Sequence, residues 1–189
     1  TYGVETDDGR LGSTELVRTH PDRDGYDEPD HDELVGGVFE PVDGDAGPGV
    51  LVLHGSEGEP PFDHAARLAH RGFTAFALHY FGGPGLPDDL VEIPLEYVET
   101  AAEWLLDHER VTGERIGVIG TSRGGELGLL AGSQFAEIGP VVSVVGGGLV
   151  WEGGATVDET PRTSSWSLDG EPIPYVPYDA DALEDGLSG

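Results

Sequence analysis

The feature that most constrains the fold is a serine set between glycines, after an apolar run and before a helical pattern. Residues 117–127 have the sequence Gly-Val-Ile-Gly-Thr-Ser-Arg-Gly-Gly-Glu-Leu. Strand, Gly-x-Ser-x-Gly and helix in this order are typical of a sharp turn that lifts a serine out of a sheet. Glycine at Gly120 and Gly124 lets strand and helix approach closely around a strained Ser122. The pattern predicts Ser122 as a nucleophile; the alternative is a turn that only packs a helix on a strand.

Two backbone segments are placed to stabilise negative charge on an oxygen beside this serine. The N–H of Arg123 lies at the N-terminus of the predicted helix, where the helix dipole favours an anion. The motif His-Gly-Ser-Glu-Gly at residues 54–58 follows the first central strand, so a backbone N–H from Ser56 or Glu57 can be the second oxyanion donor. A plain strand-to-helix turn is the alternative. We interpret His54 as a structural residue rather than a catalytic base.

The chain alternates apolar strand patterns with helical ones. Strands are predicted at residues 34–39, 50–53, 73–78, 116–119 and 141–145, and helices at residues 62–71, 94–106 and 122–133. Such alternation is typical of βαβ units and of a mostly parallel sheet with helices on both faces. We therefore divide the chain into an acidic, loosely ordered N-terminal segment (1–33), an α/β core (34–150) and a lid-like or irregular tail (151–189).

Charge sets the expected environment. The chain has 37 acidic and 9 basic residues among 189, a formal net charge of -28, and every basic residue is arginine. At roughly 1 M salt the Debye length falls to about 3 Å, which screens this self-repulsion. In dilute buffer the same charge destabilises the compact state. We infer adaptation to the salty cytoplasm of a halophilic microorganism. The alternative explanation of the acidic composition, a disordered or solvating segment, fits residues 1–33 only.

Composition also argues against several classes of partner and cofactor. An acidic surface is not attracted to nucleic acid or to anionic membranes. No segment approaches the roughly 20 apolar residues of a membrane span. Cysteine is absent, which removes disulfides and thiolate chemistry, and the histidines match no metal-binding spacing. We predict a cytoplasmic protein with no metal, cofactor, nucleic-acid or membrane partner, and we leave its oligomeric state open.

No histidine follows Ser122, although hydrolase triads on such folds occur in the chain order Ser, Asp or Glu, His. The last histidine is His108, and the downstream aspartates lie in the aperiodic tail: Asp158, Asp169, Asp179, Asp181 and Asp185. We therefore expect the sequence to stop after the sixth strand of the fold. The triad Asp and His would then lie outside this chain, and the 189 residues alone would be inactive.

From about residue 34 to 178, the chain resembles the catalytic C-terminal domain of the acyl-CoA thioester hydrolase and bile acid-CoA:amino acid N-acyltransferase family. The elbow and residues 54–58 carry the resemblance, together with residues 72–82, 86–87, 93–97 and 104–108. It implies an alpha/beta-hydrolase fold related to that of dienelactone hydrolases, with an incomplete core at 34–150. The family usually has lysine after the nucleophile, and Arg123 keeps that charge.

The resemblance implies an acyl-enzyme formed on Ser122 from an acyl-CoA thioester and released by water as a free fatty acid. Family transferases pass the acyl group to an amine such as glycine or taurine and tend to use cysteine, so serine favours hydrolysis. A carboxylester or dienelactone-type hydrolase is an alternative enzyme. The alternative without enzymatic activity is an inactive hydrolase remnant that lacks the triad Asp and His. The Arg123 side chain is interpreted either as a partner of a CoA phosphate or as a salt bridge to Glu126.

Salt dependence of stability tests the charge argument. We expect the melting temperature Tm to rise between about 0.1 M and about 1 M KCl, because the Debye length falls from about 10 Å to about 3 Å. Thermal unfolding followed by circular dichroism measures this, with sucrose at matched osmolality as the uncharged control. A Tm that does not respond to KCl would contradict the salt-adapted interpretation.

Overall fold

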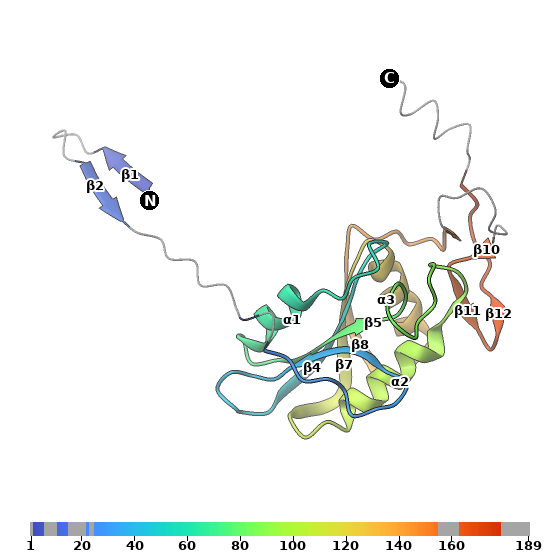
Figure 1. The fold of residues 1–189 in the computed structure, drawn as a ribbon, viewed down its shortest axis with the longest axis horizontal. Coiled ribbons are helices and arrows are strands. Elements are labelled where there is room, and N and C mark those ends of the chain that lie inside the picture. The colour runs from blue at the N-terminus through green and yellow to red at the C-terminus, as the bar shows by residue number, and fades with distance from the viewer. Residues whose placement is uncertain (1, 6–10, 15–21, 23–24, 155–162, 179–189) are drawn as a thin grey trace.

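The computed structural model describes residues 2–5, 11–14, 22, 25–154 and 163–178. Its centre is a five-stranded sheet of order β3-β5-β4-β7-β8. Only β3, at one edge, runs antiparallel to its neighbour. The strands are β3 (Val35–Phe39), β4 (Gly47–Leu53), β5 (Thr74–His79), β7 (Val111–Thr121) and β8 (Ile138–Val144). The mostly parallel sheet expected from the sequence is therefore confirmed (Figure 1).

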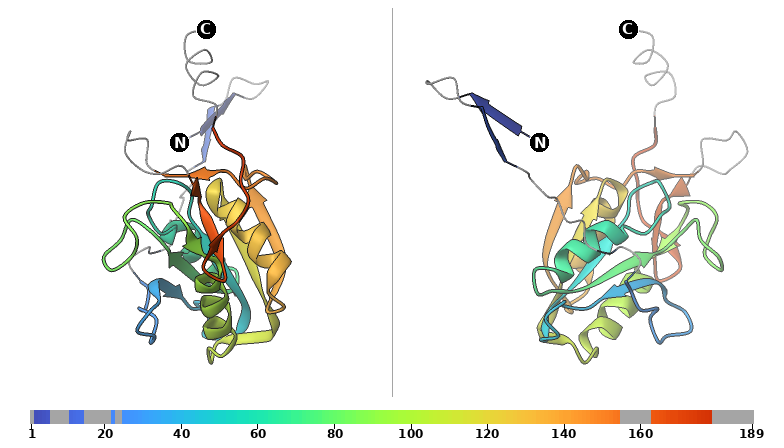
Figure 2. Two further views of the ribbon diagram at one scale, coloured as in Figure 1. Left: turned by 90° about the vertical axis from the view of Figure 1, so that its right-hand side faces the viewer. Right: turned by 60° about the vertical axis from the view of Figure 1, so that its left-hand side comes forward.

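Helices cover both faces of this sheet (Figure 2). They are α1 (Phe62–Ala69), α2 (Leu95–Leu106) and α3 (Arg123–Gln134). Side chains alternate along β4: Leu51 and Leu53 pack in the cluster that α2 and α3 cover, whereas Val52 packs against the alanines of α1. None of the helices in the described residues is long and apolar enough to cross a membrane.

Two strands, β4 and β7, begin earlier in the chain than the apolar runs from which they were predicted. β4 begins at Gly47 and β7 at Val111, where Gly47 pairs with Val111 and Pro48 with Thr112. The side chains of residues 112–115 are exposed. Because Val111 packs against the core but residues 112–115 are exposed, the sequence shows no apolar alternation there.

The two ends of the chain contain strands that the sequence did not predict. In the segment expected to be loosely ordered, β1 (Tyr2–Glu5) pairs antiparallel with β2 (Leu11–Thr14). The expected irregular tail contains β9 (Glu152–Gly153), β10 (Thr163–Ser164), β11 (Trp166–Leu168) and β12 (Glu171–Pro172). β11 pairs with β12 and, in parallel, with β6 (Ile93–Pro94) just before α2. Strands of two or three residues are too short to show a period, so the prediction for 151–189 missed them.

Candidate active site

Ser122 occupies the turn between β7 and α3 in a strained backbone conformation. Its φ is 53° and its ψ is -117°, a region that non-glycine residues rarely adopt. Such strain costs on the order of 1–3 kcal/mol and persists only where the surroundings enforce it. Main-chain bonds enforce it from two sides: the Ser122 N–H donates to Val144 O (2.8 Å), and the Gly125 and Glu126 N–H groups donate to Ser122 O (3.0 and 3.2 Å). The side chain remains partly exposed.

Two glycines let α3 approach the sheet closely at this turn. A Cβ added at Gly120 would collide with the carbonyl group of Gly124. A Cβ added at Gly124 would collide with the carbonyl oxygen of His54 and lie 2.7 Å from that of Leu53. The first turn of α3 therefore packs directly on the carboxyl end of β4, where only a residue without a side chain fits.

The loop at residues 54–58 passes beside Ser122. A Cβ added at Gly55 would lie 3.2 Å from the Ser122 Cβ and 2.6 Å from Glu57 Oε2. The Gly55 N–H donates to Glu57 Oε1 (2.9 Å) and is therefore occupied. Within the described part of the chain, neither the Ser56 N–H nor the Arg123 N–H donates a hydrogen bond. The structure thus brings the two predicted donor segments to the same edge of the sheet as Ser122.

His54 is a buried structural residue at the end of β4. Its side chain is 0% exposed and stacks on Tyr80 at 3.9 Å between ring centroids. Its Nδ1–H donates to Gly55 O (2.9 Å), and its Nε2 accepts the Tyr80 N–H (3.4 Å). Burial lowers the pKa of His54 to about 4. A neutral ring with both nitrogens engaged cannot act as the base for Ser122.

Tyr80 and His79, just after and at the end of β5, fix the loop at residues 54–58 from the other side. The Tyr80 hydroxyl donates to His54 O (2.5 Å), and burial raises the pKa of Tyr80 well above its usual range, so it stays protonated. His79 Nε2 lies 2.9 Å from Gly58 O. The predicted oxyanion loop is therefore held by contacts at both of its ends.

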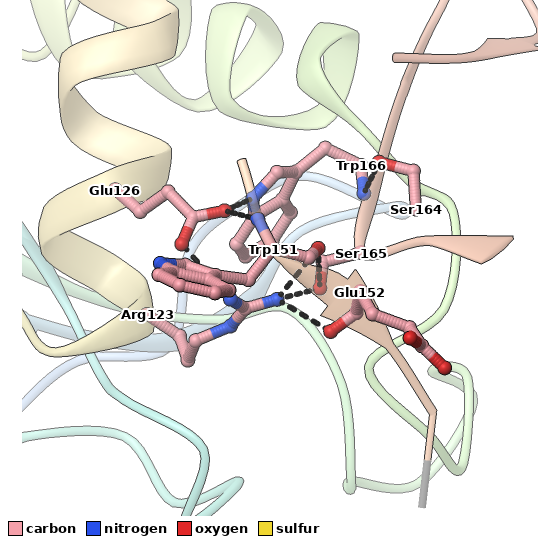
Figure 3. Close-up of polar contacts among 7 residues, drawn as sticks. All are labelled: Arg123, Glu126, Trp151, Glu152, Ser164, Ser165 and Trp166. Carbon is pink, nitrogen blue, oxygen red and sulfur yellow. Dashed lines mark hydrogen bonds and ion pairs between the residues drawn. The ribbon is translucent and has the colours of Figure 1, made fainter. Parts of the chain in front are cut away.

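The Arg123 side chain lies in a buried polar network with Glu126 and Ser165 (Figure 3). Its Nη1 donates to Glu126 Oε2 (2.9 Å), and its Nη2 donates to Trp151 O and Glu152 O (3.2 Å each) and to Ser165 Oγ. The side chains of Arg123 and Glu126 are 9% and 3% exposed. Of the two interpretations of Arg123, the salt bridge with Glu126 is confirmed, and its guanidinium is already committed to protein acceptors.

Glu126 accepts hydrogen bonds from two further groups of the chain. Its Oε1 accepts the indole N–H of Trp166 (2.7 Å) and the backbone N–H of Trp151 (3.1 Å). Burial raises the pKa of Glu126, whereas these two donors and Arg123 favour its charged form. Sequence reasoning missed Trp166, which is 0% exposed, because it stands alone in a segment without periodicity.

Of the downstream aspartates considered for a catalytic triad, the structure describes only Asp169. Asp169 lies at the turn between β11 and β12, and Asp158, Asp179, Asp181 and Asp185 lie outside the described residues. Among the residues that the structure describes, no group of three histidines or carboxylates is arranged to hold a metal ion.

Comparisons with known proteins identify the relation that these residues suggest. Residues 93–183 match the family profile described as BAAT / Acyl-CoA thioester hydrolase C terminal, so the relation to that family is confirmed. Acyl-coenzyme A amino acid N-acyltransferase 1 of Mus musculus is 38% identical over 111 residues, 59% of this chain and 27% of the relative. Acyl-coenzyme A thioesterase 6 of Homo sapiens is 40% identical over 107 residues, 57% of this chain and 25% of the relative. The matched stretches thus span about a quarter of each relative.

Solved structures confirm the alpha/beta-hydrolase fold. The alpha/beta hydrolase GrgF from a Penicillium species has a TM-score of 0.53 at 20% identity, over 62% of this chain and 42% of that chain. A dienelactone hydrolase-like promiscuous phosphotriesterase from metagenomic libraries has a TM-score of 0.51 at 20% identity, over 67% of this chain and 57% of that chain. At this identity the likeness concerns the fold alone.

Gly124→Ala tests the close approach of α3 to β4. Because the new Cβ would meet the backbone of Leu53 and His54, which cannot rotate away, we expect a loss of about 1–3 kcal/mol in the free energy of unfolding. Denaturant unfolding in high salt measures it. Gly148→Ala is the matched control, since a Cβ there meets nothing within 4 Å, and its effect should stay within about 0.5 kcal/mol. Equal effects of the two substitutions would contradict the packing described here.

Acid should weaken the fold through His54. The folded pKa of His54, about 4, lies below the ordinary histidine pKa of 6.5 in the unfolded chain, so the unfolded state binds the proton first. The stability that the neutral ring contributes is complete above pH 6.5 and is lost as the pH falls toward 4, by about 3 kcal/mol in total.

We expect this loss to disappear in His54→Gln, which has no titrating ring. Denaturant unfolding in high salt at pH values from 7 to 4 compares the two, with the exposed His64→Gln as control. Parallel pH profiles for the wild type and His54→Gln would show that His54 titrates normally in the folded state.

Proposed function

We propose that this relative of the acyl-CoA thioester hydrolases cleaves acyl-CoA thioesters through an acyl-enzyme on Ser122. The observation that carries the proposal is the strained Ser122 at the carboxyl end of a central parallel strand, directly before a helix. A strained turn of this kind holds a hydroxyl exposed above the sheet, where it can reach a bound carbonyl group. The thioesterase and transferase names of the relatives supply the substrate class.

The proposed reaction has two halves. Ser122 Oγ attacks the thioester carbonyl carbon, the C–S bond breaks, and the hydroxyl proton is passed to the departing CoA sulfur. Water then attacks the resulting ester and releases a free fatty acid, which restores the serine hydroxyl. The proposal assigns the proton transfer to none of the described histidines, and His54 in particular is committed to Gly55 and Tyr80.

Negative charge on the attacked oxygen requires donors that stand ready before the reaction. The Arg123 N–H lies at the N-terminus of α3, where the helix dipole adds to its effect. The second proposed donor is the backbone N–H of Ser56, or that of Glu57, in the loop that passes Ser122. Removing one such donor typically slows acyl transfer by about a hundredfold or more, so the rigidity of both segments matters.

The substrate carries several phosphates, and the chain is itself strongly acidic. A net charge of -28 repels an anionic CoA ester in dilute buffer. We infer that high salt is needed for binding as well as for folding, in line with a cytoplasm rich in salt. Because the guanidinium of Arg123 already bonds Glu126 and three further oxygens, the proposal gives it no part in binding the CoA phosphates.

A second candidate is transfer of the acyl group to an amino acid. It is favoured by the 38% identity to an acyl-coenzyme A amino acid N-acyltransferase. In that reaction the amine of glycine or taurine replaces water in the second half. A carboxylester or dienelactone-type hydrolase would instead accept simple esters better than thioesters.

Turnover of acyl-CoA by the native protein, expressed from its complete reading frame in high salt, tests the proposal. We expect release of CoA and free fatty acid, labelling of Ser122 by a fluorophosphonate, and loss of both in Ser122→Ala by about a thousandfold or more. Ser133→Ala, a solvent-exposed serine of α3, is the matched control and should keep both. Glycine, taurine and a simple ester as added substrates separate the alternatives. If the fluorophosphonate does not label Ser122 in the folded native protein, the proposal is wrong.

A further inference from the structure

We propose that the buried network of Arg123, Glu126, Ser165 and Trp166 is a positioning device that fixes the oxyanion donor and the strained serine for the reaction. The inference rests on the proposed function, and it assigns these side chains no contact with the substrate. They act through the main chain of the first turn of α3. Figure 3 shows the side chains converging from the helix and from the segment that contains β9, β10 and β11.

The network joins parts of the chain that lie far apart in the sequence. Arg123 and Glu126 belong to the first turn of α3, whereas their partners Trp151 and Glu152 follow β8. Ser165 lies just before β11, and Trp166 is the first residue of β11. The Ser165 hydroxyl also bonds Trp151 O (3.2 Å), so the two partner segments are tied to each other. The helix end is therefore anchored to residues 151–152 and 165–166, in addition to its contacts with the elbow and with β4.

The same two residues carry the main-chain groups that matter at the elbow. The Arg123 N–H is the proposed oxyanion donor, and the Glu126 N–H donates to the carbonyl oxygen of Ser122 (3.2 Å). A shift or rotation of this helical turn would move the donor and relax the serine together. The side chains of Arg123 and Glu126 therefore control, through the main chain of their own helical turn, the geometry that the reaction needs.

Stability alone gives little reason for a charged pair in this place. Removing two charges from water is costly, and well-packed apolar side chains often replace a buried ion pair without loss. What such side chains cannot supply is direction: the planar guanidinium bonds four acceptors and lies 5.8 Å from the Trp166 ring centroid. Trp166 and the Trp151 N–H in turn fix the carboxylate of Glu126. The network thus fixes the orientation of the first turn of α3 relative to the segments that contain Trp151 and Trp166.

The test measures kcat and KM for acyl-CoA, with kcat expressed per fluorophosphonate-labelled Ser122, so that unfolded protein does not count. Glu126→Gln keeps the shape and removes the charge, Trp166→Phe removes one donor, and Arg123→Lys keeps the charge without the planar fork. Arg115→Gln, which removes an exposed arginine, is the matched control.

We expect Glu126→Gln to lower kcat by about tenfold or more with KM nearly unchanged, because a displaced Arg123 N–H weakens binding of the transition state and not of the substrate. Trp166→Phe should lower kcat less. Arg123→Lys should lie between the wild type and Arg123→Gln, a further variant that lacks the charge. The Glu126→Gln, Trp166→Phe double variant should be little worse than Glu126→Gln alone, since Trp166 acts through Glu126. Arg115→Gln should match the wild type. A kcat per labelled site within about twofold of wild type in every folded variant would overturn the proposal.

Hydrogen–deuterium exchange gives a readout that does not depend on activity. Glu126→Gln should speed exchange at residues 122–127 and at residues 163–168 together, because one network holds both. Exchange unchanged at residues 122–127 would overturn the proposal even if the native protein neither labels nor turns over. That lack of activity would itself refute the proposed function, so the two failures are distinguishable.

Discussion

The close approach of α3 to the carboxyl end of β4 is the contact on which the rest of the site depends. Gly124 lies against the carbonyl groups of Leu53 and His54, and no side chain fits between them. With the helix end held there, the chain must leave β7 through a turn too sharp for ordinary dihedral angles, and Ser122 takes up that strain. The same contact places the first turn of α3 beside the loop at residues 54–58. One steric constraint thus sets the serine and both proposed donors.

Two buried clusters keep this contact in register, one on each side of Ser122. On the β4 side, His54 stacks on Tyr80, and both of its ring nitrogens and its carbonyl oxygen are hydrogen-bonded. On the α3 side, Arg123 and Glu126 bind the segment that carries Trp166. Both clusters exclude water from polar groups, which makes their hydrogen bonds strong and a missing partner costly. A rigid shell of this kind suits chemistry that relies on preorganised donors.

The sequence predicted what periodicity and glycine spacing encode. The apolar run of β4, the helical face that follows Pro94 in α2 and the elbow around Ser122 were all found, because each repeats a period or needs a particular residue type. β11 was not found, since three residues paired with β6 leave no period. The role of the Arg123 side chain stayed undecided for a related reason. Its acceptors include the backbone carbonyl groups of Trp151 and Glu152. Every residue has a backbone carbonyl group, so the sequence does not show which ones accept a hydrogen bond.

The central claim is that the strained serine becomes acylated, and mass spectrometry of the trapped intermediate tests it most directly. The native protein is mixed with an acyl-CoA in high salt, quenched in acid within one turnover and digested with trypsin. Cleavage after Arg115 and Arg123 isolates residues 116–123, which contain Ser122. We expect this peptide to gain the mass of the fatty acid less one water, with fragment ions that place the acyl group on Ser122 rather than Thr121. Turnover of acyl-CoA with the acyl group on another residue, or on none, would contradict it.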